Sequence, residues 1–448
     1  MNFAEATQYL LSLGHETLTM KLGLRNTELL LESLGNPQRS YESVQLAGTN
    51  GKGSTAVMLD SICRAAGIST GLYTSPHLVS ITERIKLDGN EISEDSFAKL
   101  ASEVRRAAEN LVASGKLEAL PTFFEHVTAI ALFAFRDAGV ELAILETGLG
   151  GRLDSTTAVR ARTVAITPIS VDHQECLGET LAEIAAEKAA VIRAGSVVVV
   201  SPQPEVARRV IVERCRECGV TPVWTTEDIA ELQMNFGYTF CTEKDSYENV
   251  RPALRGAHQL TNAATAIALA EALVSQGFAI GREAIIDGLE SARHPGRLEV
   301  FEDSTDDAEK VFVLLDGAHN PAGAGALRAY LDGAHHLTSS PITLVFGAMA
   351  DKQLDQMAAT LFPVAARLVL TQPRNPRAAR VEDLRQLAEK YAPEVSSEIV
   401  TESETAMARA ISLTAPNREK ICVTGSLYLV GEVRQWLETR YGLTGRFS

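Results

Sequence analysis

The chain has 448 residues, of which 45% are hydrophobic and 22% are charged, with 42 lysines and arginines against 57 aspartates and glutamates. This ordinary globular composition excludes the disordered, collagen-like and fibrous classes, and at roughly 150 residues per domain the length predicts two or three domains. The net charge of −15 argues against nucleic acid as the main partner, because sequence-independent binding depends on neutralising phosphates.

The first predicted element is an amphipathic helix, whose apolar residues at helical spacing are Phe3, Ala6, Leu10 and Leu13. Glu5 and the lack of a basic stretch before the leucines argue against a signal peptide. Uninterrupted apolar runs such as Val197–Val200 have the length of a strand and are far too short to cross a bilayer. We therefore expect a soluble cytoplasmic protein without a membrane partner.

Strands and helices alternate over the first 290 or so residues, which predicts an α/β domain with a largely parallel sheet. The predicted strands are Ser43–Ala47, Ser69–Tyr73, Val140–Leu145, Val164–Thr167 and Val197–Val200. The predicted helices are Ser54–Ala66, Ser93–Leu111, Thr122–Asp137, Leu181–Ile192 and Asn262–Ser275.

Turn residues at His294–Arg297 interrupt this pattern and predict a boundary, with domains at 1–296 and 297–448. The second set begins with the strand Val311–Leu315 and the helix Ala322–Leu331. Further predicted strands are Ile342–Phe346, Leu368–Thr371 and Ile421–Thr424. The second domain is therefore predicted to be a smaller, doubly wound, Rossmann-like domain.

The segment Gly48–Ser54, GTNGKGS, lies between a predicted strand and a predicted helix. Glycines let backbone N–H groups point at phosphate oxygens, the helix adds its positive dipole end, and Lys52 adds a mobile cation. The spacing differs from GxxxxGK[ST], and the alternative is a glycine-rich turn with an incidental lysine. The strand–turn–helix context favours a phosphate loop, so the first domain is predicted to be of the P-loop ATPase type.

Two more predicted strands deliver polar side chains at their carboxyl ends, where ligands collect in α/β sheets. Glu146 ends the buried strand Val140–Leu145 and is a candidate magnesium ligand, with a helix cap or solvated acid as the alternative. His173 follows Thr167 closely and is as consistent with a ligand as with an ordinary histidine. Lys188, on a helix with two glutamates, is by default a solvated lysine.

The six cysteines do not form a disulfide framework in a chain of this length. Cys215 and Cys218 form one CxxC in a predicted helix, but no second Cys pair or CxxH completes a tetrahedral zinc site. We expect this pair to be structurally neutral thiols.

Taken in order, the motifs resemble those of the folylpolyglutamate synthase and dihydrofolate synthase family of the Mur ligase superfamily. The matching segments cover nearly the whole chain: GTNGKGS, Tyr73–Leu78 (YTSPHL), ETGLGGRLDST from Glu146, DHQECLG from Asp172, the helix around Glu187–Ala190, Asn262–Ala266, His294–Arg297 (HPGR) and Asp316–Pro321 (DGAHNP).

The resemblance implies roles for individual residues. ATP-binding residues would be Gly51, Lys52, Gly53, Ser54, Asn262, Arg297 and Asp316. Ser75 and Glu146 match the ligands of one Mg²⁺, His173 matches a ligand of a second Mg²⁺, and Lys188 sits where family members carry a carbamylated lysine. Lys52, His173 and Lys188 are thereby the implied catalytic residues.

The resemblance also implies a substrate pocket for a pterin. The segments Thr122-Phe123-Phe124-Glu125 and Leu153-Asp154-Ser155 match those that line it. Gly23-Leu24-Arg25 matches a mobile substrate loop, and His319 matches a position near the acyl phosphate or the glutamate.

The implied activity is that of an ATP-dependent ligase that adds L-glutamate to folate, to dihydropteroate or to both, through an acyl phosphate. We expect a monomer whose partners are these small molecules, with both activities in one enzyme. The alternatives are a monofunctional folylpolyglutamate synthase, a Mur-type ligase of cell-wall precursors and a nucleotide switch without ligase chemistry. The TFFE and HPGR segments argue against the last two.

Overall fold

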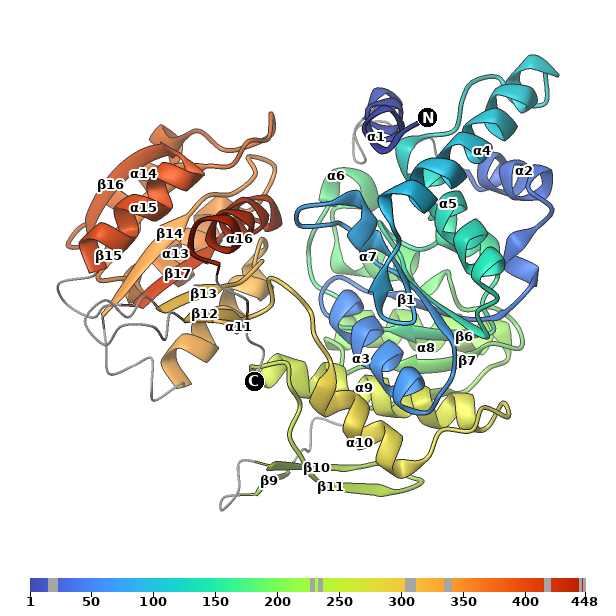
Figure 1. Ribbon diagram of the computed structural model, residues 1–448. Coiled ribbons are helices and arrows are strands. Elements are labelled where there is room, and N and C mark those ends of the chain that lie inside the picture. The colour runs from blue at the N-terminus through green and yellow to red at the C-terminus, as the bar shows by residue number, and fades with distance from the viewer. Residues whose placement is uncertain are drawn as a thin grey trace. The chain divides into compact units, whose positions relative to one another are not determined.

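The computed structural model describes residues 1–14, 23–225, 230–232, 237–302, 312–333, 341–414, 420–442 and 445 (Figure 1). The chain divides into two compact units. The N-terminal unit contains residues 1–252 and 260–292, and the C-terminal unit contains residues 253–259 and 293–448. Among the described helices, none combines the length and the apolar character that a membrane span requires.

The N-terminal unit is built on an eight-stranded sheet with the order β4-β3-β2-β5-β1-β6-β7-β8. Its strands are β1 (Glu42–Ala47), β2 (Thr70–Tyr73), β3 (Ile85–Leu87), β4 (Asn90–Glu91), β5 (Leu142–Glu146), β6 (Thr163–Ile166), β7 (Val197–Val200) and β8 (Pro222–Trp224). Six strands run parallel, and β3 and β4 add an antiparallel edge. The chain continues from β1 to strands on one side of it (β2) and later to strands on the other side (β6). Such a reversal of strand order predicts a crevice at the carboxyl end of β1.

The helices of this unit are α1 (Phe3–Ser12), α2 (Arg25–Ser33), α3 (Lys52–Ala65), α4 (Glu94–Ala113), α5 (Phe123–Ala138), α6 (Gln174–Leu177), α7 (Leu181–Ala189), α8 (Glu205–Cys218) and α10 (Arg282–Ser291), and α9 (Ala257–Val274) begins in the C-terminal unit. Short 3-10 turns are η1 (Pro37–Arg39), η2 (Ile81–Arg84) and η3 (Ser155–Val159). Helix α4 begins after its cap Ser93, whose hydroxyl accepts a hydrogen bond from the Ser96 N–H.

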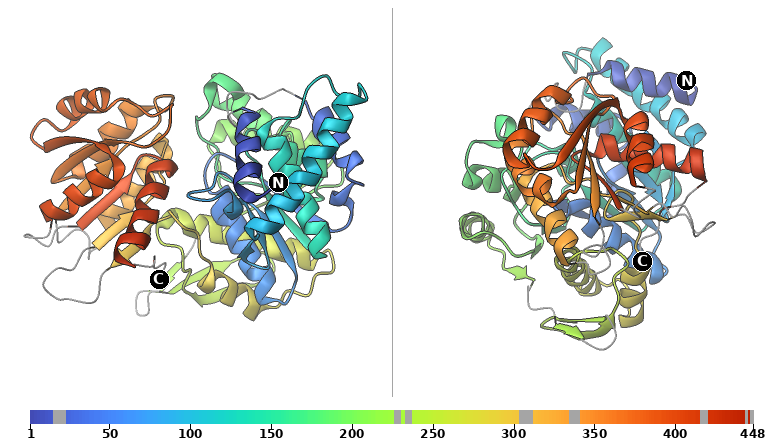
Figure 2. Two further views of the ribbon diagram at one scale, coloured as in Figure 1. Left: turned by 45° about the horizontal axis from the view of Figure 1, so that its top comes forward. Right: turned by 90° about the vertical axis from the view of Figure 1, so that its left-hand side faces the viewer.

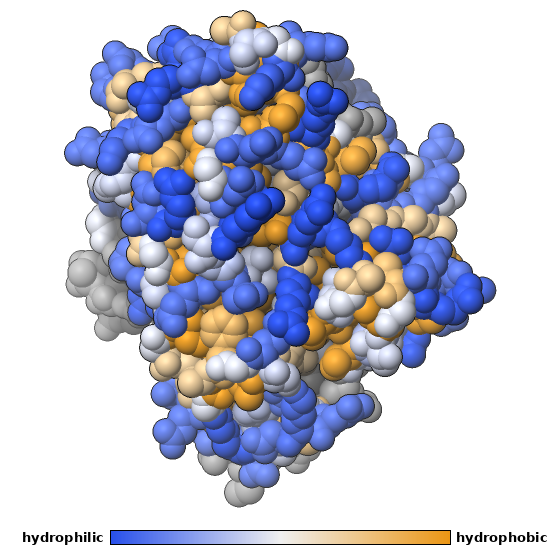
Figure 3. Space-filling model, turned by 90° about the vertical axis from the view of Figure 1, so that its right-hand side faces the viewer, coloured by the Kyte–Doolittle hydropathy of each residue, from blue (hydrophilic) through white to orange (hydrophobic). Residues whose placement is uncertain are grey.

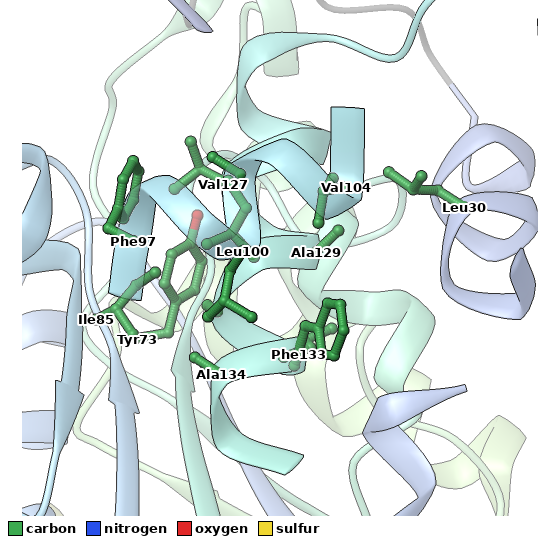
Figure 4. Close-up of a cluster of buried hydrophobic side chains, with 14 of the residues drawn as sticks. Leu30, Tyr73, Ile85, Phe97, Leu100, Val104, Val127, Ala129, Phe133 and Ala134 are labelled. Atoms are coloured by element: carbon green, nitrogen blue, oxygen red, sulfur yellow. The ribbon is translucent and has the colours of Figure 1, made fainter. Parts of the chain in front are cut away.

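One apolar cluster of this unit joins α1, α2, α4 and α5 to strands β2 and β5. Figure 4 shows side chains of α4 and α5, among them Leu100 and Val127, gathered around Tyr73 of β2. A second cluster joins α7 and α8 to β6 and β7. The face shown in Figure 3 carries hydrophilic side chains over much of its extent, with hydrophobic residues in patches between them, as is usual for a globular surface.

A small antiparallel sheet of β9 (Ala230–Leu232), β10 (Gly237–Cys241) and β11 (Ser246–Val250) lies apart from the large sheet of this unit (Figures 1 and 2). Glu271 of α9 connects this small sheet to the helix, because its carboxylate accepts hydrogen bonds from the hydroxyls of Thr242 (2.7 Å) and Tyr247 (3.0 Å). The alternation in the sequence did not predict this sheet.

The C-terminal unit has a six-stranded sheet with the order β12-β13-β17-β14-β15-β16. Its strands are β12 (Glu299–Glu302), β13 (Phe312–Leu315), β14 (Ile342–Phe346), β15 (Arg367–Gln372), β16 (Ser396–Glu402) and β17 (Lys420–Thr424). Its helices are α11 (Pro321–Gly333), α13 (Leu354–Leu361), α14 (Val381–Tyr391), α15 (Ser403–Thr414) and α16 (Leu427–Tyr441), with a 3-10 turn η4 (Phe362–Val364).

All strand pairs of this sheet are parallel except β12 with β13. Helices flank the sheet in the two views of Figure 2. The predicted fold class, a mostly parallel α/β sheet followed by a smaller Rossmann-like sheet, is confirmed. Val311, the predicted start of the first strand, lies outside the described residues.

Candidate active site

The glycine-rich loop connects the carboxyl end of β1 to the first turn of α3. The backbone N–H groups of Thr49 and Asn50 both donate to the carbonyl of Pro168, at 3.0 and 3.1 Å. The Thr49 hydroxyl donates to the carbonyl of Ser170 (3.0 Å) and accepts from its N–H (3.1 Å). The segment after β6 therefore holds this loop in place.

Glycine is required at two positions of the loop. A β-carbon at Gly48 would collide with the hydroxyl of Thr167 and lie 2.9 Å from its carbonyl oxygen. Gly51 has a φ of 86°, and a β-carbon there would collide with the side-chain oxygen of Asn262. Asn262, which belongs to α9 and lies far along the sequence, is thus packed against the loop.

Lys52 and Ser54 lie in the first turn of α3. The ammonium of Lys52 donates to the carbonyl of Thr49 at 3.2 Å, so the cation stays at the mouth of the loop. Ser54 is buried, and Gly53 between them is half-buried. A glycine-rich loop, a helix N-terminus and a mobile ammonium group are together suited to a polyphosphate.

Lys188 is buried beside the loop. The default interpretation of a solvated lysine is therefore wrong. Lys188 is only 4% exposed, and its Nζ donates to the carbonyl of Gly48 at 2.8 Å. Burial lowers the pKa of Lys188 to about 7, the positive charge of Lys52 contributes to the lowering, and Asp172 and Asp154 oppose the shift. Much of this amine is therefore neutral near pH 7.

Ser75 and Glu146 meet at the carboxyl ends of two parallel strands. Glu146 ends β5 opposite Leu46 of β1, and Ser75 follows β2. The Ser75 N–H donates to the Glu146 carboxylate at 3.1 Å, and Glu146 is only 6% exposed. The structure brings together this predicted pair at the edge of the sheet that carries the glycine-rich loop.

His173 caps the short helix α6 with a φ of 52°. Its backbone N–H donates to the carboxylate of Asp172 at 2.9 Å, and its Nε2 lies 3.9 Å from the same oxygen. Asp172 also acts electrostatically on Lys188 and opposes the lowering of its pKa.

The segment Thr122–Glu125 forms the start of α5. Thr122 and Glu125 make a capping box, in which the Glu125 carboxylate accepts from the Thr122 N–H at 2.7 Å. The hydroxyl of Thr27 in α2 lies 3.4 Å from the Glu125 carboxylate and 3.3 Å from the Ser155 hydroxyl. Thr27 thus joins the two predicted pterin segments.

The two phenylalanines of this segment have different neighbours. The guanidinium of Arg84 lies 5.3 Å from the centre of the Phe123 ring, within the range of a cation–π contact. A β-carbon at Gly148 would collide with the ring of Phe124. The glycine-rich stretch after β5 therefore approaches the start of α5 closely.

Asp154 is buried and acts as an acceptor. Its carboxylate accepts hydrogen bonds from the N–H groups of Leu149 (2.9 Å) and Thr156 (3.0 Å) and from the Thr156 hydroxyl (2.6 Å). Burial raises the pKa of Asp154, and these hydrogen bonds oppose the shift. Leu153 beside it is half-buried.

In the C-terminal unit, Asp316 follows β13 and is buried. Its carboxylate accepts from the N–H groups of Leu298 (3.1 Å) and Ala318 (3.0 Å). Burial raises the pKa of Asp316, and the nearby charge of Arg297 opposes the shift. His319 Nδ1 lies 2.8 Å from the carbonyl of Gly317, so these predicted residues gather in one place within this unit.

The remaining predictions fall outside these clusters. Arg25 is the exposed first residue of α2, and Gly23 and Leu24 precede it. All six cysteines are free, and burial raises the pKa of Cys215 to about 11.

Sequence reasoning missed Thr27 and Gln45. Gln45 is fully buried, and its side-chain amide donates to the hydroxyls of Thr156 (2.9 Å) and Thr157 (2.7 Å). A polar residue inside an apolar strand was the signal that could have found Gln45. Thr27 carries no comparable signal, because its contacts depend on the packing of α2.

Comparisons with known proteins identify related chains. The Mur ligase middle domain matches residues 46–270, and the Mur ligase glutamate ligase domain matches residues 296–427. A dihydrofolate synthase/folylpolyglutamate synthase of Bacillus subtilis is 33% identical over 95% of this chain and 97% of its own length.

Two similar solved structures carry ligands. An Escherichia coli FolC in complex with DHPP and ADP has a TM-score of 0.84 and 30% identity, over 98% of this chain and 99% of its own. A Yersinia pestis bifunctional folylpolyglutamate synthase/dihydrofolate synthase complexed with AMPPNP and Mn ion has a TM-score of 0.82 and 30% identity, over 98% of each chain.

Proposed function

This chain belongs to the folylpolyglutamate synthase/dihydrofolate synthase family of Mur ligases, and we propose that it is an ATP-dependent ligase that adds L-glutamate to a pterin-linked carboxylate. The observation that carries the proposal is the convergence of Lys188, Asn262 and Thr167 on the loop at the carboxyl end of β1. A loop held from three sides provides a fixed cradle for the phosphates of ATP.

The reaction requires activation, because a carboxylate is a poor acyl donor. A carboxylate oxygen of the acceptor attacks the γ-phosphorus of ATP, and ADP leaves. The neutral amine of glutamate then attacks the carbonyl carbon, phosphate leaves, and the amine loses a proton as the amide forms. Lys52 stabilises the charge on the transferring phosphoryl group, and Gly51, Gly53, Ser54 and Asn262 hold the nucleotide.

The residues at the strand ends fit a magnesium ion. Mg²⁺ prefers oxygen ligands and is usually held by one or two carboxylates together with phosphate oxygens. Glu146 and Ser75, whose N–H donates to the Glu146 carboxylate, supply such oxygens. When bound, Mg²⁺ neutralises charge on the phosphates, and His173 is proposed as a ligand of a second ion.

Lys188 is proposed to carry a carbamate. Its neutral amine attacks CO₂, a C–N bond forms and one proton is released. The product keeps an N–H for the carbonyl of Gly48 and replaces a cation beside Lys52 with an anion. The lowered pKa of Lys188 supports this proposal, because only the neutral amine reacts.

The acceptor is proposed to bind among Thr122–Glu125 and Leu153–Ser155, which Thr27 joins. We propose that both folate and dihydropteroate are accepted, as the dual name of the Bacillus subtilis relative suggests. In the C-terminal unit, Arg297 and Asp316 are proposed nucleotide contacts, and His319 is a proposed contact of the acyl phosphate or the glutamate. We further propose that the enzyme is a cytoplasmic monomer.

Mass spectrometry of the products tests the proposal. The enzyme is incubated with ATP, Mg²⁺ and L-glutamate, with either dihydropteroate or tetrahydrofolate as acceptor. A product heavier by one glutamyl residue is expected in both mixtures. Such a product from tetrahydrofolate alone would establish the monofunctional alternative, and none in either mixture would refute the proposal.

A further inference from the structure

Gln45 is a polar side chain at the centre of the large sheet. It lies in β1, between Leu145 of β5 and Val164 of β6, and it is fully buried. A buried amide costs free energy unless it is hydrogen-bonded. Its Nε2 donates to the hydroxyls of Thr156 (2.9 Å) and Thr157 (2.7 Å), so both amide hydrogens are used.

The direction of these hydrogen bonds follows from the second partner of each threonine hydroxyl. The Thr157 hydroxyl lies 2.7 Å from the carbonyl of Gly151, which can only accept. The Thr156 hydroxyl lies 2.6 Å from the carboxylate of Asp154, which already accepts backbone N–H groups. Each threonine therefore donates its hydrogen onward and accepts from Gln45.

The side-chain oxygen of Gln45 does not explain why an amide occupies this position. Within the described part of the chain this buried oxygen has no hydrogen-bond partner. An apolar residue of similar shape would avoid that cost. The two donated hydrogen bonds are therefore the reason for an amide at this position.

These hydrogen bonds fix the segment between Leu149 and Ser155. Asp154 accepts from the N–H of Leu149, and a β-carbon at Gly151 would lie 2.8 Å from the carbonyl oxygen of Glu187. The segment is thus anchored to β1 through Gln45 while it packs against α7.

We infer that Gln45, acting through Thr156 and Thr157, is a positioning residue that sets the pterin side of the acceptor site. The inference rests on the proposed function, which places Leu153–Ser155 in that site. It assigns Gln45 no contact with the substrate. We assign its effect to the acceptor site, because the hydrogen bonds lead to Asp154 and Gly151.

The test compares Gln45→Leu and Thr156→Val with Thr156→Ser, which keeps the hydroxyl. Thr163→Val is the matched control, because Thr163 is also buried and accepts from a glutamine amide, that of Gln276, at 2.7 Å. We expect the first two variants to raise KM for the pterin acceptor about tenfold, while KM for ATP and kcat stay within about twofold. Thr156→Ser and Thr163→Val should keep the KM of the wild type.

Hydrogen exchange of residues 149–155 in the same variants measures the positioning without turnover. Exchange should be faster in Gln45→Leu and Thr156→Val than in the wild type, and unchanged in Thr163→Val. An acceptor KM and exchange rates equal to those of the control would overturn the inference. Wild-type enzyme that uses neither acceptor would instead refute the proposed function. If Gln45→Leu does not fold, the two Thr156 variants decide the question.

Discussion

Two loops of the molecule follow parallel strands, and they are held in different ways. The Gly48–Gly51 loop after β1 depends on Lys188 and Asn262 and on the segment after β6, all distant in the sequence. The Asp316–His319 loop after β13 is held by backbone groups, since the N–H of Asp316 donates to the carbonyl of Val423 at 3.0 Å and the N–H of Gly317 donates to the carbonyl of Gly296 at 2.8 Å. Within the loop, the Asp316 carboxylate accepts from the Ala318 N–H, and His319 Nδ1 lies 2.8 Å from the carbonyl of Gly317.

Side chains of distant helices contact the first loop, whereas backbone groups hold the second. The first loop is assembled by long-range contacts, so its geometry depends on the packing of several helices. The second loop is held by hydrogen bonds to the backbone of neighbouring segments, among them the N–H of Leu298 on the Asp316 carboxylate and the N–H of Gly425 on the Ala318 carbonyl. Substitutions should therefore affect the two loops unequally.

The largest effect is expected from Lys52→Ala, which removes the cation of the first loop and leaves its backbone in place. We expect kcat to fall by about 10²-fold or more, as for lost electrostatic stabilisation of a transition state. Steady-state ADP release measures the loss. Glutamate ligation at a near-normal rate would contradict the phosphate-loop assignment.

Glu146→Gln should have the next largest effect. It keeps the shape of the side chain and can still accept from the Ser75 N–H, but it loses the charge that Mg²⁺ prefers. Activity at low magnesium should fall by about tenfold and recover in part as magnesium is raised. Titration of activity with MgCl₂ is the measurement, and an unchanged magnesium dependence would count against a ligand role.

Gly48→Ala and Gly317→Ala compare the two loops directly. The new β-carbon at residue 48 meets the backbone and hydroxyl of Thr167, whereas at residue 317 it meets the ends of the Leu427 and Arg297 side chains, which can move. We expect a loss in unfolding free energy of about 3 kcal/mol for Gly48→Ala and about 1 kcal/mol for Gly317→Ala. Urea denaturation measures both, and equal losses would contradict the comparison.

The smallest expected effect is a change in the pH dependence of stability, caused by His126 of α5. This residue also contacts a residue that is distant in the sequence. Its Nε2 lies 3.2 Å from the Tyr9 hydroxyl and its Nδ1 lies 3.1 Å from the Thr122 carbonyl. Burial lowers its pKa from 6.5 to about 4. The unfolded chain therefore binds more protons between these values, and stability falls as the pH drops through this window.

His126→Gln should flatten this part of the pH dependence. Thermal unfolding from pH 7 to pH 4 measures it, with the wild type as reference. A variant that loses stability as steeply as the wild type over this window would show that His126 is not responsible.

Much of the fold was predictable from local pattern. The strand Val197–Val200 matches β7, and the helix predicted over Thr122–Asp137 matches α5, which Thr122 caps. The hairpin of β3 and β4 was not predicted, because its strands are short and β4 is exposed. The helix predicted from Asn262 begins earlier, at Ala257, since polar residues in its first turn concealed its start.

The site was predictable where a motif is local and not where a contact is distant. The glycines of the first loop follow from the sequence, whereas the burial of Lys188 follows from how α7 packs. No spacing rule links Gln45 to Thr156, because residues so far apart in the sequence meet only in the folded sheet. The resemblance supplied Lys188 and Asn262, which local reasoning alone did not.

The most direct test of the account is ADP release by the wild-type enzyme with Mg²⁺ and ATP, measured with and without each of the other substrates. We predict ADP release only when L-glutamate and a pterin acceptor, dihydropteroate or tetrahydrofolate, are both present. ADP release at the same rate without an acceptor would indicate a nucleotide switch and would contradict the ligase.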